Sequence, residues 1–139
     1  MGGLMSRNKG KRGEREVIEL LQPIVNAVYA RAGMEVPKLQ RNTLQSDGGG
    51  FDIAGLEWLA LEVKFQETLS VNQWWAQTLE QANGTQCPVL IYRQSRQPWR
   101  VKMFVEATAC GVRYRLPATL ELDEFLGWFQ LRLTEELTR

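Results

Sequence analysis

The 139-residue sequence contains no histidine. This absence excludes serine and cysteine hydrolases that rely on a histidine base, zinc sites built from histidine, and acid–base catalysis by imidazole. Any chemistry must therefore use carboxylates, lysine, hydroxyl groups and a hard metal ion.

Cysteine and long apolar runs are also scarce. The two cysteines, Cys87 and Cys110, are predicted to be free thiols in the core. No apolar run is long enough to cross a membrane, and the N-terminus is polar and basic, unlike a signal sequence. We therefore expect a cytoplasmic protein without a membrane partner.

Positive charge is unevenly distributed, although the formal net charge is only +1. Residues 6–12 (SRNKGKR) hold four basic residues and no acidic one, and a second basic group lies in residues 93–102. Such local groups favour phosphate contacts, while the alternative is a solvated tail and a charged hairpin. The candidate DNA-binding residues are Arg7, Lys9, Lys11, Arg12, Arg41, Arg93 and Arg96.

The length and the pattern of apolar residues predict one α/β domain with a mixed β-sheet and helices on its faces. Residues 1–9 are predicted to be a flexible basic segment, and residues 10–139 a single domain. Apolar spacing predicts a helix from Gly10, with a kink or a second helix at Pro23 and a stop at Gly33. Further helices are expected in residues 70–82 and 120–138, and strands within residues 35–46, 88–92 and 99–105.

The stretch from 51 to 65 is predicted to be a β-hairpin that carries three ionisable residues. Glu62 and Lys64 are two apart, so in a strand they point to the same face. Asp52, on the preceding strand, supplies a second carboxylate. Two convergent carboxylates repel each other unless a cation lies between them, and Mg²⁺ is commonly held by one or two carboxylates. The alternative is that Glu62 and Lys64 form the solvated face of an edge strand.

The register of this hairpin decides whether the carboxylates can meet. Opposed residues of an antiparallel pair point to the same face, so Asp52 must lie opposite Glu62. That register requires an odd-length connection, such as residues 56–58, or a bulge near Gly55. We therefore expect one of these two features, with both carboxylates close enough to share one cation.

Three segments of the chain resemble the PD-(D/E)xK nuclease superfamily and, within it, the archaeal-type Holliday-junction resolvases. Residues 9–15 (KGKRGER) are similar to the basic Lys-Gly-x-x-x-Glu-Arg pattern of their first helix. Asp52-Ile53 is similar to the start of their hairpin, and Glu62-Val63-Lys64 to their Glu-x-Lys strand. The resemblance spans residues 9–92, and Phe51 stands where the superfamily has proline.

The resemblance implies a restriction-endonuclease-like fold and a metal-dependent, structure-selective endonuclease. Asp52 and Glu62 would hold Mg²⁺, with Mn²⁺ as a substitute, and Glu14 would complete or support the site. Lys64 would act on the attacking water. Ser46 in the glycine-rich loop would touch the scissile phosphate, and Asp47 is a rival metal ligand.

The implied partner is branched or duplex DNA, bound by a homodimer without an organic cofactor, in a bacterial, archaeal or phage-infected host cell. A symmetric junction needs two coordinated sites, which a two-fold dimer supplies. The alternatives are a nickase, a repair or restriction-like nuclease of the same fold, or a DNA-binding module without cleavage.

Overall fold

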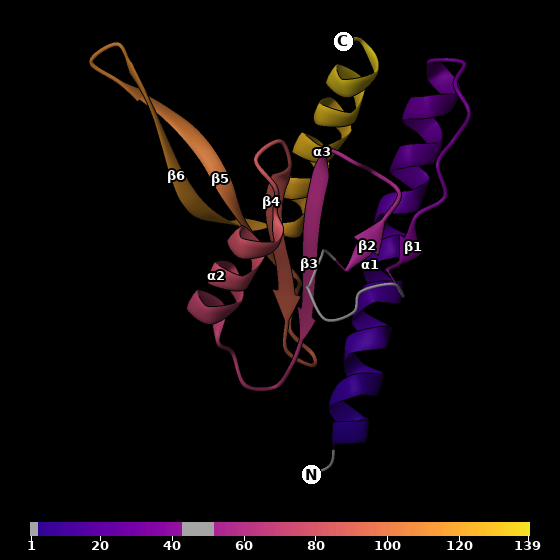
Figure 1. Ribbon diagram of the computed structural model, residues 1–139, viewed down its shortest axis with the longest axis vertical. Coiled ribbons are helices and arrows are strands. Elements are labelled where there is room, and N and C mark those ends of the chain that lie inside the picture. The colour runs from indigo at the N-terminus through magenta and orange to yellow at the C-terminus, as the bar shows by residue number, and fades with distance from the viewer. Residues whose placement is uncertain (1–2, 43–51) are drawn as a thin grey trace.

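The computed structural model describes the backbone of residues 3–42 and 52–139, with side chains from Asn8 onward. The order of elements is α1 (Gly3–Arg31), β1 (Gln40–Arg41), β2 (Ile53–Ala54), β3 (Leu59–Phe65), α2 (Val71–Gln81), β4 (Cys87–Arg93), β5 (Arg100–Ala109), β6 (Val112–Glu121) and α3 (Leu122–Leu137) (Figure 1). Ser46 and Asp47 lie outside the described residues. None of the described helices is long and apolar enough to span a membrane.

A mixed sheet with the strand order β3-β4-β5-β6 forms the centre of the fold. β3 and β4 run parallel, because α2 supplies the crossover that a parallel pair requires. β4 and β5 are antiparallel, as are β5 and β6. The predicted α/β architecture with a mixed sheet is therefore present.

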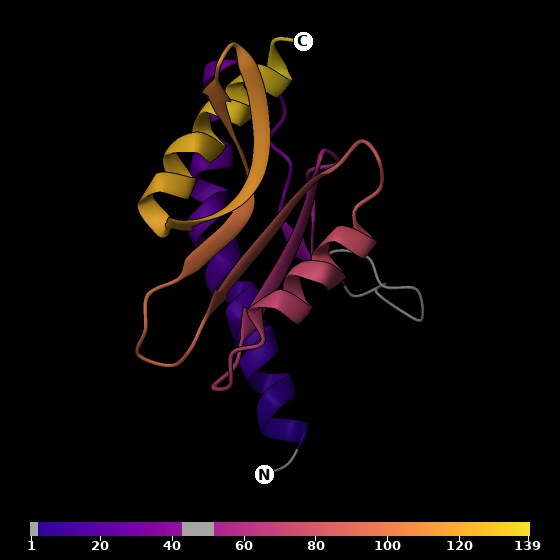
Figure 2. The same ribbon diagram turned by 90° about the vertical axis from the view of Figure 1, so that its left-hand side faces the viewer.

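Helices cover both faces of the sheet (Figure 2). On one face, α1 and α3 bury apolar side chains such as Leu21 and Phe129 against Leu61 and Val63 of β3. On the other face, α2 packs Trp74 and Trp75 against β4. Each large apolar side chain that is fully buried stabilises the fold by about 1.5–3 kcal/mol. The sheet is thus held between two apolar layers, and β3 is an edge strand beside α1.

The first helix differs from its prediction. It begins at Gly3 rather than near Gly10, so the segment expected to be flexible is helical from residue 3. It also continues through Pro23 as one helix, so a second helix starting there is wrong. The predicted stop is confirmed, because Gly33 follows the helix with a φ of +68°. A proline costs a helix about 3 kcal/mol, which the apolar packing of α1 on both sides of Pro23 offsets.

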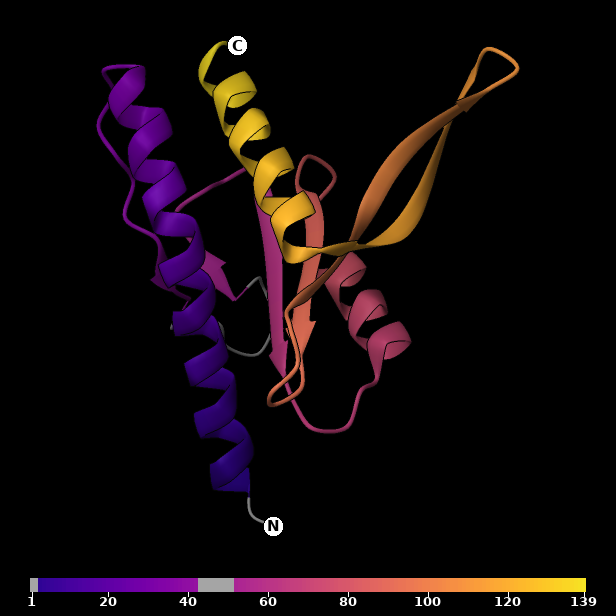
Figure 3. The same ribbon diagram turned by 180° about the vertical axis from the view of Figure 1, so that it is seen from behind.

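The strands β5 and β6 extend beyond the body of the protein as a long hairpin (Figure 3). β5 is buried at Val101 and Met103 but exposed from Glu106 onward. Cys110 and Gly111 form its tip with φ values of +49° and +74°. Cys110 is exposed, so its predicted place in the core is wrong, whereas Cys87 is half-buried. Both thiols are free, as predicted.

The predicted hairpin between residues 51–54 and 58–65 does not form as a ladder. β2 pairs with β1, with Arg41 opposite Ile53. The connection from β2 to β3 contains Gly55, Leu56, Glu57 and Trp58, which is an even number of residues. The expected odd-length loop is therefore wrong. Gly55 does have a positive φ, +130°, as we expected that a glycine at this position could adopt.

Candidate active site

The strand β3 presents Glu62 and Lys64 on the face of the sheet that α2 covers. In the parallel register Glu62 lies beside Leu90 and Lys64 beside Tyr92, and both of these neighbours pack with α2. The Glu62 residue is only 4% exposed, and the Lys64 side chain is 22% exposed. The Lys64 Nζ atom lies 4.0 Å from Glu62 Oε1. The predicted common face is therefore confirmed, but the solvated-face alternative is wrong for Glu62 because it is buried.

Asp52 is fixed by the backbone on both sides of it. Its N–H donates to the carbonyl of Leu61 at 2.9 Å, and its carbonyl accepts from the N–H of Asn42 at 2.8 Å. Its carboxylate Oδ2 accepts from the N–H of Val63 at 2.7 Å. The Asp52 side chain therefore takes the place that a partner strand would have at the edge of β3. This is how Asp52 reaches Glu62 although no ladder sets the register.

The buried carboxyl groups of Asp52 and Glu62 are hydrogen-bonded to each other. The pKa of Glu62 is raised to about 9, first by burial and then by the charge and the hydrogen bond of Asp52. The Lys64 ammonium opposes this shift, while Glu14 adds to it. A hydrogen bond between two carboxyl groups requires a proton on one of them, so Glu62 is the group that stays neutral.

Glu14 joins this cluster from α1, because α1 approaches β3 very closely at Gly13. A Cβ atom at Gly13 would lie 2.9 Å from the Cβ of Phe65, closer than real Cβ contacts. Burial raises the pKa of Glu14, the hydrogen bond from Arg41 lowers it, and the charge of Asp52 raises it. The Arg41 Nε atom donates to Glu14 Oε1 at 2.7 Å. Arg41, expected to contact DNA, is thus placed against a carboxylate of the cluster.

We call Glu14, Asp52, Glu62 and Lys64 the carboxylate site. Its donor set fits a hard divalent cation, because carboxylate oxygens are the ligands that Mg²⁺ prefers and a cation can replace the proton between Asp52 and Glu62. Within residues 3–42 and 52–139, no three such side chains are gathered closely enough to form a ready-made metal cluster. The fit therefore rests on the Asp52–Glu62 pair, with Glu14 beside it.

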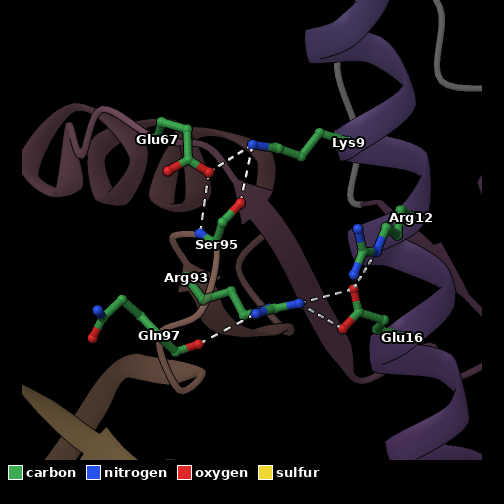
Figure 4. Close-up of polar contacts among 7 residues, drawn as sticks. All are labelled: Lys9, Arg12, Glu16, Glu67, Arg93, Ser95 and Gln97. Atoms are coloured by element: carbon green, nitrogen blue, oxygen red, sulfur yellow. Dashed lines mark hydrogen bonds and ion pairs between the residues drawn. The ribbon is translucent and has the colours of Figure 1, made fainter.

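Two members of each basic group of the sequence line one cavity of about 570 Å³. Lys9 and Arg12 come from α1, and Arg93 comes from the end of β4 (Figure 4). Arg96 comes from the turn after β4. The cavity is also lined by Phe65, Glu67 and Ser95. We call this set the cation pocket. Phe65 directly follows Lys64 on β3, but its side chain points to the opposite face of the sheet, the face that α1 covers.

The remaining predicted basic residues lie elsewhere. Lys11 is exposed on α1 and does not line the cavity. Arg7 is in α1, but its side chain lies outside the described residues.

Sequence reasoning missed three residues that shape these sites, namely Gly13, Glu67 and Ser95. Gly13 lies next to Glu14 in the pattern of residues 9–15, but nothing in the pattern shows that this glycine, rather than Gly10, touches β3. A Cβ atom at Gly10 would have open space around it. Glu67 and Ser95 have no local signal, since their contacts depend on how the strands are paired.

A comparison with protein families gives one match. Residues 5–118 match the family described as "Phage putative PDDEXK endonuclease". No curated protein and no solved structure matches the chain. The matched segment contains the whole carboxylate site and the whole cation pocket. The match supports the PD-(D/E)xK superfamily through a phage family, and not the archaeal-type resolvases in particular. Because it covers most of the sequence, the chain belongs to this phage family of PD-(D/E)xK endonucleases.

Proposed function

We propose that this protein is a metal-dependent DNA endonuclease that hydrolyses phosphodiester bonds at the carboxylate site. The observation that carries the proposal is the buried, hydrogen-bonded pair of Asp52 and Glu62 with the Lys64 ammonium beside it. Two adjacent buried carboxyl groups destabilise a fold unless a proton or a cation lies between them. A site of this kind is better explained by chemistry than by stability, and the family supports a nuclease.

Each residue of the carboxylate site has a separate proposed role. Asp52 and Glu62 are the proposed ligands of Mg²⁺, with Mn²⁺ as a substitute, and Glu14 completes or supports them. When bound, the ion supplies Lewis-acid stabilisation of the phosphate oxygens. Lys64 orients the attacking water and stabilises the negative charge that develops as the phosphodiester bond breaks.

One backbone N–H and one arginine side chain hold these groups in place before substrate binds. The Val63 N–H sets the direction of the Asp52 carboxylate, and Arg41 sets that of Glu14. Fixed dipoles and charges of this kind cost little reorganisation during the reaction. The roles of Val63 and Arg41 are positioning roles.

We extend the proposal to branched DNA, cut by paired nicks from a homodimer. The support is the resemblance of residues 9–15, 52–53 and 62–64 to archaeal-type resolvases, together with the need of a symmetric junction for two coordinated sites. The second candidate is a nickase or restriction-like nuclease that cuts duplex DNA, since the matched family is described only as an endonuclease.

A cleavage assay tests the proposal and separates the two candidates. Purified protein is incubated with labelled junction, flap, duplex and single-stranded DNA, with Mg²⁺, with Mn²⁺, or with a chelator. We expect cleavage that depends on the metal and is lost in Glu62→Gln. Preference for the junction, with paired nicks, supports the resolvase candidate, and equal cutting of duplex DNA supports the second. Metal-dependent cleavage of equal rate in Glu62→Gln would reject the carboxylate site, and DNA binding without cleavage would indicate a binding module.

A further inference from the structure

The cation pocket holds a carboxylate where a substrate phosphate would fit. Glu67 Oε1 accepts from the Lys9 ammonium at 2.6 Å and from the N–H of Ser95 at 3.1 Å. The Lys9 Nζ atom also donates to Ser95 Oγ at 3.2 Å, so these three groups form one closed set (Figure 4). The Lys9 ammonium and the Ser95 N–H both donate to this one carboxylate, and donors of these two kinds also bind phosphate oxygens.

Positive charge in this pocket exceeds the negative charge around it. The cations of Lys9, Arg12 and Arg93 lie 5.3, 5.4 and 4.2 Å from the centre of the Phe65 ring. Glu16 neutralises part of this charge through an ion pair with Arg93 at 2.9 Å and a longer contact with Arg12 at 3.4 Å. In the part of the chain that the structure describes, Arg96 forms no ion pair. The pocket therefore keeps capacity for a further anion.

Arg96 is held in an unfavourable backbone conformation. Its φ is +63°, in the left-handed region that glycine occupies without cost, within a turn closed by a hydrogen bond from Gln97 N–H to the Gln94 carbonyl. A non-glycine residue in such a region costs on the order of 1 kcal/mol and is common where a side chain has a task. At this position the arginine side chain lines the cation pocket.

The pocket is close to the carboxylate site along the chain. Two residues, Phe65 and Gln66, separate Lys64 from Glu67, and the three steps along the chain span at most about 10 Å between the two Cα atoms. Successive phosphates of one DNA strand advance about 3.4 Å along the helix axis. The Cα atoms of Lys64 and Glu67 are therefore no farther apart than about three nucleotides of one strand.

We propose that the cation pocket binds a non-scissile backbone phosphate of DNA, and that Glu67 occupies this position in the free protein and is displaced by the substrate. The inference rests on the proposed function as a DNA nuclease and adds a second binding site to it. Glu67 can leave because its side chain is 56% exposed and it precedes α2 in the connection from β3. Its hydrogen bonds from Lys9 and Ser95 hold its pKa at about 2, so it is ionised and competes with phosphate at neutral pH.

The test measures binding of the full chain to a short labelled DNA duplex by fluorescence anisotropy, with a chelator present so that no cleavage occurs. Glu67→Gln keeps the size of the side chain and removes its charge. We expect binding to tighten by about two- to fivefold, the range of an exposed ion pair. Glu80→Gln, on the exposed face of α2, removes the same charge away from the pocket and is the matched control.

A second variant tests the pocket from the opposite direction. Arg96→Gly removes the cation but relieves the positive φ, so we expect no loss of thermal stability while binding weakens. The slope of log affinity against log salt should fall by about one unit. Arg31→Ala is the control, because Arg31 lies about 33 Å from Lys9 along α1 at the rise of a helix.

The outcomes separate this inference from the proposed function. Tighter binding in Glu67→Gln than in Glu80→Gln, with weaker binding in Arg96→Gly than in Arg31→Ala, supports the phosphate site. If the wild-type protein binds DNA but each variant equals its control, the phosphate site is wrong and the nuclease proposal stands. If the wild-type protein binds no DNA, both are wrong.

Discussion

Glu62 lies on β3 and Glu67 lies just beyond the end of this strand, yet their pKa values shift in opposite directions. Burial raises that of Glu62 to about 9, whereas the hydrogen bonds of Lys9 and Ser95 lower that of Glu67 to about 2. Glu62 is withdrawn from water beside another carboxyl group, and Glu67 is exposed beside a cation. The comparison shows that burial and partners, not residue type, decide what a glutamate can do.

The same contrast distinguishes the carboxylate site from the cation pocket. The carboxylate site cannot hold two charges together without a cation, so it is suited to bind a metal ion. The cation pocket faces solvent, where partners exchange at low cost, so it is suited to bind and release a phosphate. Both regions take residues from α1 and β3.

The largest predicted effect comes from removing one carboxylate of the carboxylate site. In Asp52→Asn or Glu62→Gln, cleavage should fall by about 10²- to 10³-fold or more, taking the loss of one preorganised electrostatic group as the guide. DNA binding should stay equal or become tighter, because a negative charge that repels phosphate is removed. Single-turnover cleavage and anisotropy measure the two quantities separately.

The control for this prediction is Glu57→Gln, at an exposed position in the connection from β2 to β3. It should cut at the wild-type rate. A wild-type rate in Asp52→Asn or in Glu62→Gln would show that the altered residue does not act in the reaction.

The next largest effect comes from removing basic side chains of the cation pocket. Replacing Lys9 and Arg12 together by alanine should lower the salt slope of duplex binding by about two units, since each phosphate contact contributes about 0.9. Adding Lys11→Ala should bring the total to at most about three units. Anisotropy titrations between low and moderate salt measure the slope. An unchanged slope in the double variant would show that α1 does not contact the DNA backbone.

A third prediction concerns the closeness of α1 to β3, on which both regions depend. Gly13→Ala should destabilise the fold by about 1–3 kcal/mol, as overpacking does, and should reduce cleavage by moving Glu14. Gly10→Ala is the matched control on the same helix, where a Cβ atom meets open space. It should stabilise the helix by about 0.5–1 kcal/mol.

Thermal or urea unfolding of the two glycine variants tests this pair. Equal stability of Gly13→Ala and Gly10→Ala would contradict the close contact between Gly13 and Phe65.

Patterns within one element predicted much of this structure. The two-residue period placed Glu62 and Lys64 on one face, and the buried run of β4 and the alternation of β5 gave an antiparallel pair joined by the turn at residues 94–98. The boundaries of α2 were also predicted, with Ser70 before it and Ala82 after it. In each case the information lies in neighbouring residues.

Features that depend on distant segments were not predictable in this way. β6 was missed although apolar residues recur at every second position from Val112 to Leu120, because it contains Pro117, which is unusual within a strand. Its ladder comes from pairing with β5 across the tip at Cys110 and Gly111. The way in which Asp52 comes close to Glu62 was predicted wrongly. β2 pairs with β1 and not with β3, and the Asp52 side chain accepts a hydrogen bond from the Val63 N–H.

The cation pocket shows the same limit. The sequence indicates two separate basic groups, and only the parallel register, with Phe65 beside Arg93, brings them to one end of the sheet. The approach of α1 then adds Lys9 and Arg12 to the same cavity. A charge pattern can therefore suggest phosphate binding, but strand order decides which cations act together.

The smallest predicted effect is the pH dependence of the ion pair between Glu67 and Lys9. The pKa of Glu67 in the folded protein is about 2, below its ordinary value of 4.5. Glu67 therefore contributes stability above pH 4.5 that is lost as the pH falls through this range toward 2. Melting temperatures from pH 6 down to 3 should show the difference between the wild-type protein and Glu67→Gln becoming smaller as acid is added. In a Lys9→Ala background most of this pH dependence should disappear, because the hydrogen bond from Lys9 is its largest cause. A difference that does not vary with pH would mean that Lys9 and Glu67 do not stabilise each other in solution. Glu67 would then not compete with a phosphate for the cation pocket.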